Sequence, residues 1–372
     1  MEGITDGQLY LLIEKSINSH IVDNRQWCHI SKRDVLNLFI QGMSYGCASL
    51  HALDNLGRIP HIIKFTGSSR KQVASDSTLA RLFASQYSIP DDLSTLVLDD
   101  IKSYLPIPAS KKLLLIDGSG QSGRLYSIAA LNWDSPIVIG IEQQEKHGKE
   151  LPTSKKQVLN LINRTGSSFD IVVGDALYFD QEFFQILVDH GKDLFVKTRE
   201  ANLDIVQYTE SQYKISLASR WKKIPEKTHF DEKRGLFYKV FHLKDYHYKY
   251  LEKPLQCFRI EERDPKTDTS ELFFCITTAE GLSSFEAREI AKLRWQIEDN
   301  VFRHGNQLFH TKHRFFRNDK TNRKYLTLLY LLLGLFQFLF VQALKSGSFT
   351  SHSMNLKVFI EWAFAEWHTN SS

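Results

Sequence analysis

Cysteine is scarce in this chain of 372 residues, and the cysteines present are not arranged for metal binding. Cys28, Cys47, Cys257 and Cys275 are separated by 19, 210 and 18 residues, and no two of them form a CxxC pair. Zinc fingers need closely spaced cysteines, and disulfide scaffolds need a dense framework of them. The sequence therefore predicts a protein of a reducing compartment without a zinc finger.

The chain also lacks a strong excess of charge and an export signal. It carries 47 basic and 43 acidic side chains, and its 42% of hydrophobic residues is ordinary for a soluble protein. Acidic residues stand near the N-terminus, where a secretory signal requires a basic start and an apolar core, so we expect a cytoplasmic protein. A chain of this length is too long for one compact core, and two or three domains are expected.

Only one apolar run in the sequence is long enough to cross a bilayer. It covers residues 325–344, YLTLLYLLLGLFQFLFVQAL. Thr327, Gln337 and Gln342 interrupt it, and no second run of this kind accompanies it. We therefore expect a buried core helix and no membrane, and a membrane anchor is the alternative.

Basic side chains are concentrated in one segment of the C-terminal half. Residues 288–324 contain ten Lys or Arg against four Asp or Glu, although the net charge of the whole chain is only +4. Such a segment is either a solvated face or a surface that meets phosphates.

The segment KLLLIDGSGQSG, residues 112–123, organises the chain. Four consecutive apolar residues precede Asp117, and glycine and serine follow it. A short apolar run bounded by turn residues is typical of a strand buried on both faces. A carboxylate at its end is partly desolvated, and because an unpaired buried charge is costly, Asp117 should have a cation beside it. We expect Asp117 to be the first ligand of a metal site.

The order of elements after Asp117 predicts an α/β fold with a ribonuclease-H-like mixed sheet and flanking helices. Strands are expected at 113–117, 124–133 and 137–141, the last two antiparallel, followed by a helix at 154–163. A further strand at 171–173 ends at Asp175 in the sequence FDIVVGDALYFD, and a helix at 181–190 and a strand at 194–197 complete the order. Two carboxylates at two strand ends suggest one site.

A third carboxylate is expected on a helix covering residues 284–309. At about 100° per residue, Ile290, Ile297 and Val301 form part of an apolar stripe, and the charged side chains occupy the far side. Arg294 and Glu298 are four residues apart, one turn from each other, and lie beside the stripe. They form either a structural salt bridge or, with Asp117 and Asp175, a catalytic site.

Residues 1–105 read as helical, with helices at 7–19, 31–43 and 44–56. A stretch from residue 65 resembles the second half of a helix-turn-helix, with a possible N-cap at Ser75 or Asp76. An ordinary surface helix is the alternative. The candidate DNA contacts of this stretch are Arg70, Lys71, Ser77, Thr78 and Arg81.

Residues 201–282 interrupt the expected catalytic domain. Alternating patterns at 235–243, 257–262 and 272–277 predict strands, so we expect a β-rich insertion. Trp221, flanked by Arg220 and Lys222, is either a packing residue or a candidate to stack on an unpaired base. The tail after Ser346 is expected to be helical, with aromatic residues at 359, 362, 364 and 367 covering the core.

With Asp117, Asp175, Arg294 and Glu298 as candidate site residues, the chain resembles the insertion-sequence DDE transposases. The closest type carries the signature Tyr-x2-Arg-x3-Glu-x6-Lys around its third carboxylate, the insertion-sequence-4 family. The resemblance covers most of the chain, and Arg294 and Glu298 match the signature at the right spacing. Two positions depart from it, because Ala291 stands where the family has Tyr and Gly305 where it has Lys.

The resemblance implies a DNA transposase that cuts and joins DNA by in-line phosphoryl transfer with two Mg²⁺ ions, for which Mn²⁺ can substitute. By the family pattern Asp117 bridges both ions, and Asp175 and Glu298 each bind one. Arg294 orients Glu298 or grips a phosphate. The missing Tyr and Lys contact DNA phosphates in the family, and the residues that could substitute here include Arg303 and Lys312.

The resemblance also implies double-stranded DNA as partner, both as element ends and as target, a homodimer in the synaptic complex, and a nucleoid-associated location. It divides the chain into a helical DNA-binding domain at 1–105, a catalytic domain at 108–200 and 283–345, the insertion at 201–282 and a helical tail at 346–372.

Three other interpretations compete with this one. Gly118 to Gly123 matches the GxGxxG of a dinucleotide site, with Glu142 further on, although Asp117 would set a charge beside the pyrophosphate. His304, His310 and His313 suggest zinc, but no cysteine accompanies them. The departures at Ala291 and Gly305 suggest a transposase-derived protein that binds DNA without cutting it.

Overall fold

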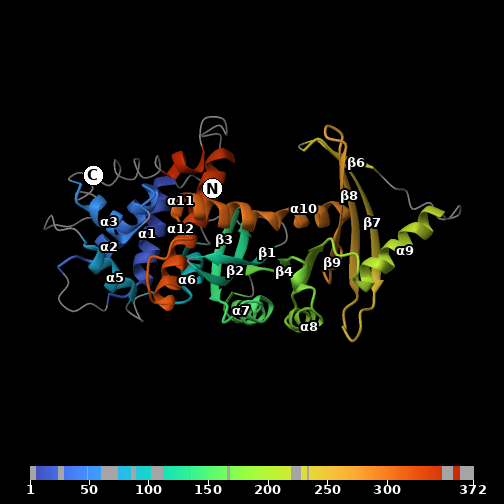
Figure 1. Cartoon of the computed structure of the whole chain (residues 1–372), viewed down its shortest axis with the longest axis horizontal. Helices are drawn as coiled ribbons and strands as arrows, with labels where there is room; N and C mark the ends of the chain where they lie inside the picture. The colour runs from blue at the N-terminus through green and yellow to red at the C-terminus, as the bar shows by residue number, and fades with distance from the viewer. Residues whose placement is uncertain are drawn as a thin grey trace. The chain divides into compact units, whose positions relative to one another are not determined.

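The computed structural model describes residues 6–23, 29–47, 49–59, 74–84, 89–101, 112–121, 123–133, 135–165, 168–218, 228–232, 234–345 and 355–360. These residues form an α/β protein whose nine strands make one mixed sheet in the order β3-β2-β1-β4-β5-β9-β8-β7-β6, with helices flanking it (Figure 1). The predicted fold class is confirmed at this level, and the arrangement is compatible with a ribonuclease-H-like fold.

The chain folds as two compact units. The first comprises residues 1–110, 118–165 and 298–372, and the second comprises residues 111–117 and 166–297. Strand β1, Leu113–Gln121, begins in the second unit and continues into the first after Asp117.

The first unit starts with the expected helices. Leu36 and Phe39 of one of these helices, like Leu82 and Phe83 of another, are fully buried, which explains the helical spacing of the apolar residues. The helices are α1 (Asp6–His20), α2 (Lys32–Ser44), α3 (Leu50–Gly57), α5 (Asp76–Ala84) and α6 (Leu93–Ile101).

The helix expected at 44–56 is wrong at its start. A turn at Tyr45 and Gly46 ends α2, and Gly46 adopts a φ of +67° that favours glycine. Helix α3 begins only at Leu50, because the Ser49 side chain accepts a hydrogen bond from the Ala52 backbone N–H at 3.1 Å and caps it.

The remainder of the first unit is a hairpin covered by helices on the two sides. Strands β2 (Arg124–Trp133) and β3 (Ser135–Gln143) pair antiparallel as expected. Helix α7 (Glu150–Thr165) packs on both strands, and α12 (Asp319–Lys345) packs on β3. Gly334 of α12 permits this contact, because a Cβ there would lie 2.9 Å from the Ile137 Cα.

Helix α12 contains the long apolar run. It is long and apolar enough to cross a membrane, but 83% of its most apolar window is buried inside the protein. Burial to this extent is typical of the core helix of a soluble protein, so the finding favours the expected core helix over the membrane anchor. Phe359 lies in a helical stretch of the tail, is fully buried and packs on Phe340 with ring centroids 5.3 Å apart. The other predicted tail aromatics lie outside the described residues.

The second unit is built on parallel strands. Strand β4 (Ile171–Gly174) pairs in parallel with β1 and with β5 (Asp193–Thr198). Between β4 and β5 lie the short helix η2 (Ala176–Tyr178) and α8 (Gln181–Asp189). These bounds agree with the expected strand, helix and strand.

The predicted β-rich segment extends this sheet. Strand β9 (Thr269–Thr277) pairs antiparallel with β5, and β8 (Leu255–Asp264), β7 (Leu236–Tyr246) and β6 (His229–Asp231) follow outward. The three predicted strands are confirmed and are longer than expected. A helix that the sequence analysis missed, α9 (Asp204–Ala218), packs on β7 and β8.

The helix expected at 284–309 is interrupted. Helix α10 (Ser284–Leu293) ends before Arg294, and a π-helix follows at Ile297–Arg303. Helix α11 (His304–Phe309) comes next, and His310, with a φ of +51°, is its C-cap. A π-helix takes more residues per turn than an α-helix, so a face calculated at 100° per residue no longer holds beyond Ile297.

Candidate catalytic site

Asp117 and Asp175 lie at the same level of two neighbouring parallel strands. Leu115 of β1 stands opposite Val173 of β4, and each aspartate follows two residues later, with Asp175 the first residue after β4. Neighbouring strands are about 4.8 Å apart, and residues at the same level project to the same face. The register therefore brings the first two predicted carboxylates to neighbouring strands at about the same level, and their convergence on one site stays a prediction.

The predicted position of Asp117 needs a correction. We expected it at the end of its strand, but β1 continues to Gln121. The parallel partner β4 ends first, at Gly174, so Asp117 lies beyond the paired part of β4 and not beyond β1 itself.

Asp175 is held by the backbone that follows it. Its side chain accepts a hydrogen bond from the Leu177 N–H at 2.9 Å and caps η2. Gly174 allows this fold-back, because a Cβ there would lie 2.5 Å from the Tyr178 ring. The sequence GDALY therefore fixes Asp175 immediately after its strand.

Arg294 is the cation that the buried position of Asp117 required. Its Nη1 lies 3.5 Å from Asp117 Oδ2, and the two side chains are 9% and 13% exposed. The guanidinium also lies 4.7 Å from the ring centroid of Trp295, which is 42% exposed. Arg294 therefore pairs with the first carboxylate, and the role toward Glu298 or a phosphate that the family resemblance implies stays a prediction.

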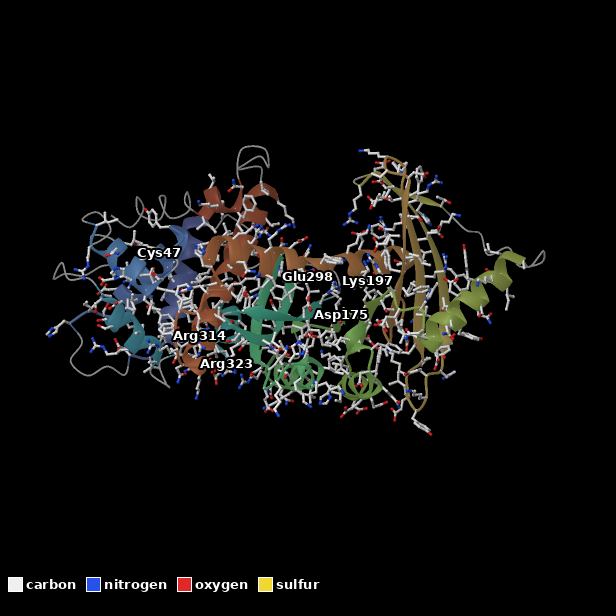
Figure 2. All side chains as sticks on the ribbon, viewed as in Figure 1. Cys47, Asp175, Lys197, Glu298, Arg314 and Arg323 are labelled. Carbon is white, nitrogen blue, oxygen red and sulfur yellow. The ribbon has the colours of Figure 1, made fainter. Side chains whose placement is uncertain are left out.

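Lys197 lies on the strand next to β4 and was missed by the sequence analysis. Gly174 stands opposite Val196, and Asp175 and Lys197 are the next residues of the two segments (both labelled in Figure 2). Its Nζ lies 4.1 Å from the centre of the Phe273 ring and 3.8 Å from Glu271 Oε1. Burial lowers the pKa of Lys197, and Glu271 offsets this only in part. Its position one strand beyond the second carboxylate was the signal available in the sequence.

A buried ion network anchors the helix that leads to Arg294. Arg288 of α10 is fully buried, lies 4.0 Å from the Tyr238 ring centroid, and hydrogen bonds to Asp231 at 2.7 Å and to Glu262. Lys292 lies 3.0 Å from Glu262. The N-terminus of the helix is fixed by a capping box between Ser283 and Glu286. Helix α10 is thereby attached to β6 and β8.

Glu298 lies in the π-helix, four residues after Arg294 and at the start of the other compact unit. Its side chain is half-buried. The convergence of Glu298 with Asp117 and Asp175 stays a prediction.

The two positions that depart from the family signature are both buried. Ala291 is fully buried in α10. Gly305 is buried in α11, and a Cβ there would lie 2.7 Å from the Tyr330 ring and 3.2 Å from Thr311. A tyrosine or lysine at these positions would meet packed side chains, so the family's phosphate contacts cannot be made from here.

The remaining predicted DNA contacts lie in separate places. Ser77 and Arg81 are exposed on α5, while Thr78 is half-buried and donates its N–H to the capping Ser75 hydroxyl. Arg303 is exposed and lies 3.3 Å from Asp299. Lys312 is exposed and lines a pocket of the first unit. Arg70, Lys71 and Trp221 lie outside the described residues.

A different group of side chains meets metal-ligand distances. Among the residues that the structure describes, the ligand atoms of His51, Asp54 and Asp76 all lie within 4.8 Å of one another. Asp54 already pairs with Arg58 at 2.9 Å, and the other two side chains are exposed. The group was not predicted, because its members come from two helices and share no sequence motif.

The two competing metal and nucleotide interpretations fit the geometry poorly. Gly118 and Gly120 lie inside β1, and the segment after Gly123 forms strand β2, whereas a dinucleotide site requires a helix there. His304 Nδ1 lies 2.9 Å from Gln337 Nε2, and burial lowers its pKa, so this ring is a neutral acceptor in the core.

Comparison with models of known protein families finds no match, and comparison with curated proteins finds none either.

Proposed function

We propose that the chain is a DNA transposase of the DDE type that binds the ends of its element and cuts and joins DNA strands. The observation that carries the proposal is that Asp117 and Asp175 both follow paired residues of two neighbouring parallel strands, with Arg294 beside Asp117. Two carboxylates brought together in this way, beside cations, suit phosphoryl transfer on a polyanionic substrate.

The donor set fits Mg²⁺. Asp117 and Asp175 offer hard carboxylate oxygens, no cysteine or histidine stands beside them in the two strands, and Mg²⁺ prefers such ligands. Asp117, Asp175 and Glu298 would hold the metal. Two bound Mg²⁺ ions would activate the attacking oxygen and stabilise the leaving oxygen of an in-line displacement.

The surrounding side chains have separate roles in this proposal. Arg294 holds the Asp117 carboxylate in place and limits the repulsion between the two aspartates. Lys197 supplies a positive charge on the next strand, where a scissile phosphate would approach Asp175. The protein acts as a homodimer on double-stranded DNA in the cytoplasm, associated with the nucleoid.

The experiment is a cleavage assay with the full-length protein. A linear DNA carrying the sequences that flank the gene is incubated with the protein in Mg²⁺, with EDTA as the control. We expect strand cleavage that is lost in Asp117→Asn and in Asp175→Asn, while DNA binding remains. Cleavage that persists in both variants would refute the proposed site.

The alternative is a transposase-derived protein that binds DNA without cutting it. The absence of the signature's Tyr and Lys, in whose places Ala291 and Gly305 stand, favours it. Specific binding to the flanking DNA without any Mg²⁺-dependent cleavage would establish the alternative and exclude the enzyme.

A further inference from the structure

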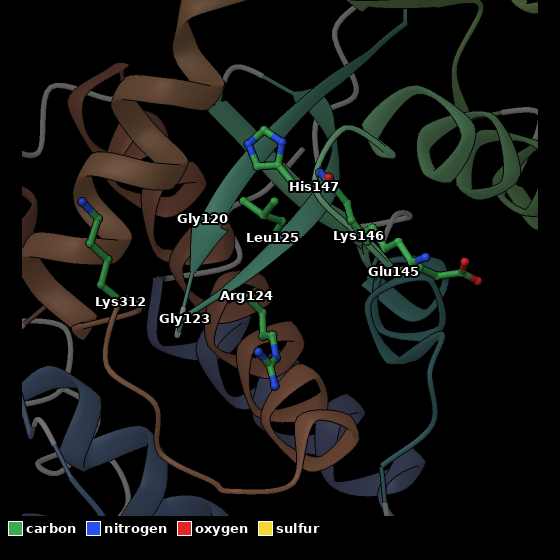
Figure 3. A pocket seen from close by; sticks show the side chains of 9 residues that line it. Gly120, Gly123, Arg124, Leu125, Glu145, Lys146, His147 and Lys312 are labelled. Carbon is green, nitrogen blue, oxygen red and sulfur yellow. The ribbon is translucent and has the colours of Figure 1, made fainter.

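A basic pocket lies in the first unit, formed by segments that the proposed catalytic chemistry does not use. It has a volume of about 560 Å³ and lies at the turn between β1 and β2, at the loop between β3 and α7, and at the segment after α11 (Figure 3). We refer to it as the hairpin pocket. Its lining residues are Gly120, Gly123, Arg124, Leu125, Gln144, Glu145, Lys146, His147 and Lys312.

The charge of the hairpin pocket is positive. Its lining contains three permanent cations, Arg124, Lys146 and Lys312, and one carboxylate, Glu145. Arg124 lies 3.1 Å from Asp319. Among the residues that the structure describes, neither lysine has an ion-pair partner, and both are exposed. Figure 3 shows Lys312 on one side of the pocket and Lys146 with Glu145 on the other.

Lys312 is placed by a buried polar cluster. The adjacent Thr311 is fully buried, and its hydroxyl lies 2.9 Å from Gln121 Oε1 of β1 and 2.7 Å from Asn306 Oδ1. Tyr330 of α12 donates its O–H to the Thr311 hydroxyl oxygen at 3.1 Å. The backbone that carries Lys312 is thus tied to β1, which contributes Gly120 to the pocket.

The wall on the other side of the pocket is the loop between β3 and α7, and hydrogen bonds define it equally well. The Gln144 N–H donates to the Leu125 carbonyl at 2.9 Å and extends the β2–β3 pairing to the start of the loop. The loop then turns at Gly148, which has a φ of +78°, and this turn presents Lys146 and His147. Cations held on two separate, hydrogen-bonded walls form a binding surface for an extended anion.

The lining identifies the kind of anion. Among the lining residues that the structure describes, Leu125 is the one apolar side chain, and none is a phenylalanine, tyrosine or tryptophan that could stack on a base. Gly120 and Gly123 leave the floor without side chains, so a backbone can approach closely. We propose that the hairpin pocket binds phosphates of a DNA backbone, independent of base sequence and separate from the carboxylate site. This inference rests on the proposed function in taking DNA as the polyanion.

The test measures how DNA binding depends on salt, in EDTA, so that it does not depend on catalysis. Binding of a fluorescent duplex is measured for the full-length protein and for Lys146→Ala/Lys312→Ala at several salt concentrations. Losing two phosphate contacts should reduce the slope of log affinity against log salt by about 1.8, which is about 60-fold in affinity at 0.1 M salt.

A matched control removes the same charge elsewhere in the same unit. Lys15 of α1 and Lys156 of α7 are exposed and do not line the pocket. The slope for Lys15→Ala/Lys156→Ala should stay within a few tenths of that of the unmodified protein. Glu145→Gln should act in the opposite direction and tighten binding, which a misfolded variant would not do.

The outcomes separate this inference from the proposed function. An unchanged slope in the Lys146/Lys312 variant overturns the hairpin pocket as a DNA site, even if Mg²⁺-dependent cleavage is observed. A reduced slope without any cleavage supports the pocket and leaves the catalytic proposal refuted. Binding of AMP or inorganic phosphate that requires both lysines, with DNA binding unaffected, would assign the pocket to a free phosphate ligand and overturn the inference.

Discussion

Replacing Arg288 tests whether the buried ion network anchors helix α10. Arg288 is fully buried and bonds to Asp231 and Glu262, whose side chains are 14% and 11% exposed. Breaking a buried pair by removing one partner costs about 3–5 kcal/mol, because an uncompensated charge remains. Lys292 stays near both carboxylates, at 3.7 and 3.0 Å, so the lower end applies. We expect Arg288→Ala to lower the free energy of unfolding by about 3 kcal/mol.

The control uses an arginine on the same carboxylate. Arg234 lies 3.5 Å from Asp231 but is 41% exposed, and exposed ion pairs contribute about 0–1 kcal/mol. Urea unfolding of both variants, followed by circular dichroism, should show a large loss for Arg288→Ala and a small one for Arg234→Ala. Equal losses, or a loss below about 1 kcal/mol for Arg288→Ala, would show that burial does not determine the strength of this network.

The same variant has a pH signature. The hydrogen bond from Arg288 lowers the pKa of Asp231 below its ordinary 3.8. Burial raises the pKa of Glu262, but Lys292 and Arg288 lower it by more, so this pKa lies below its ordinary value of 4.5. Carboxylates with lowered pKa values stabilise the fold above their ordinary values, and this stabilisation is lost as pH falls through the folded values. The difference between the unmodified protein and Arg288→Ala should therefore shrink below pH 4.5, and a constant difference would contradict the argument.

Three further variants probe the packing and the site. Lys197→Met keeps a long side chain against Phe273 and should reduce Mg²⁺-dependent cleavage at least tenfold. The free energy of unfolding should change little, because a desolvated cation is a weak source of stability. Cleavage at the rate of the unmodified protein would exclude a role for the charge of Lys197. Gly305→Lys introduces the lysine of the signature that the sequence resembles but overpacks against the Tyr330 ring. It should lower stability by about 1–3 kcal/mol or more without improving cleavage. Gly334→Ala should cost about 1–3 kcal/mol in thermal unfolding despite the better helix propensity of alanine, because its Cβ meets the backbone of β3; a more stable variant would contradict the close approach.

The strands around the site could be predicted because their apolar runs are short and bounded by turn residues. LLLID and IVVGD each lie between polar segments, and the order of strands and helices indicated a ribonuclease-H-like mixed sheet. Lys197 could not be assigned a role in the same way. A lysine at a strand end is common, and only the register with β4 places it level with Asp175.

The interruption after Arg294 could not be predicted from periodicity. The apolar spacing of Ile290, Ile297 and Val301 is that of a continuous helix, and all three are buried. The π-helix begins within this stripe, where tertiary packing overrides the local pattern. The hairpin pocket could not be predicted from the sequence for a related reason. Its cations come from three segments of the chain, which meet only in the folded protein, where Thr311 hydrogen bonds to Gln121 of β1.

The departures at Ala291 and Gly305 do not favour an inactive remnant as strongly as the sequence alone suggested. Both positions are packed in the core, so the small residues there serve the fold. Lys197 is the informative case. Burial lowers its pKa, Glu271 compensates only in part, and a buried cation of this kind contributes little to stability. A cation on the strand next to Asp175 suits phosphoryl transfer on a polyanionic substrate, so the enzyme stays our proposal, and the cleavage measured for Lys197→Met decides whether this charge takes part.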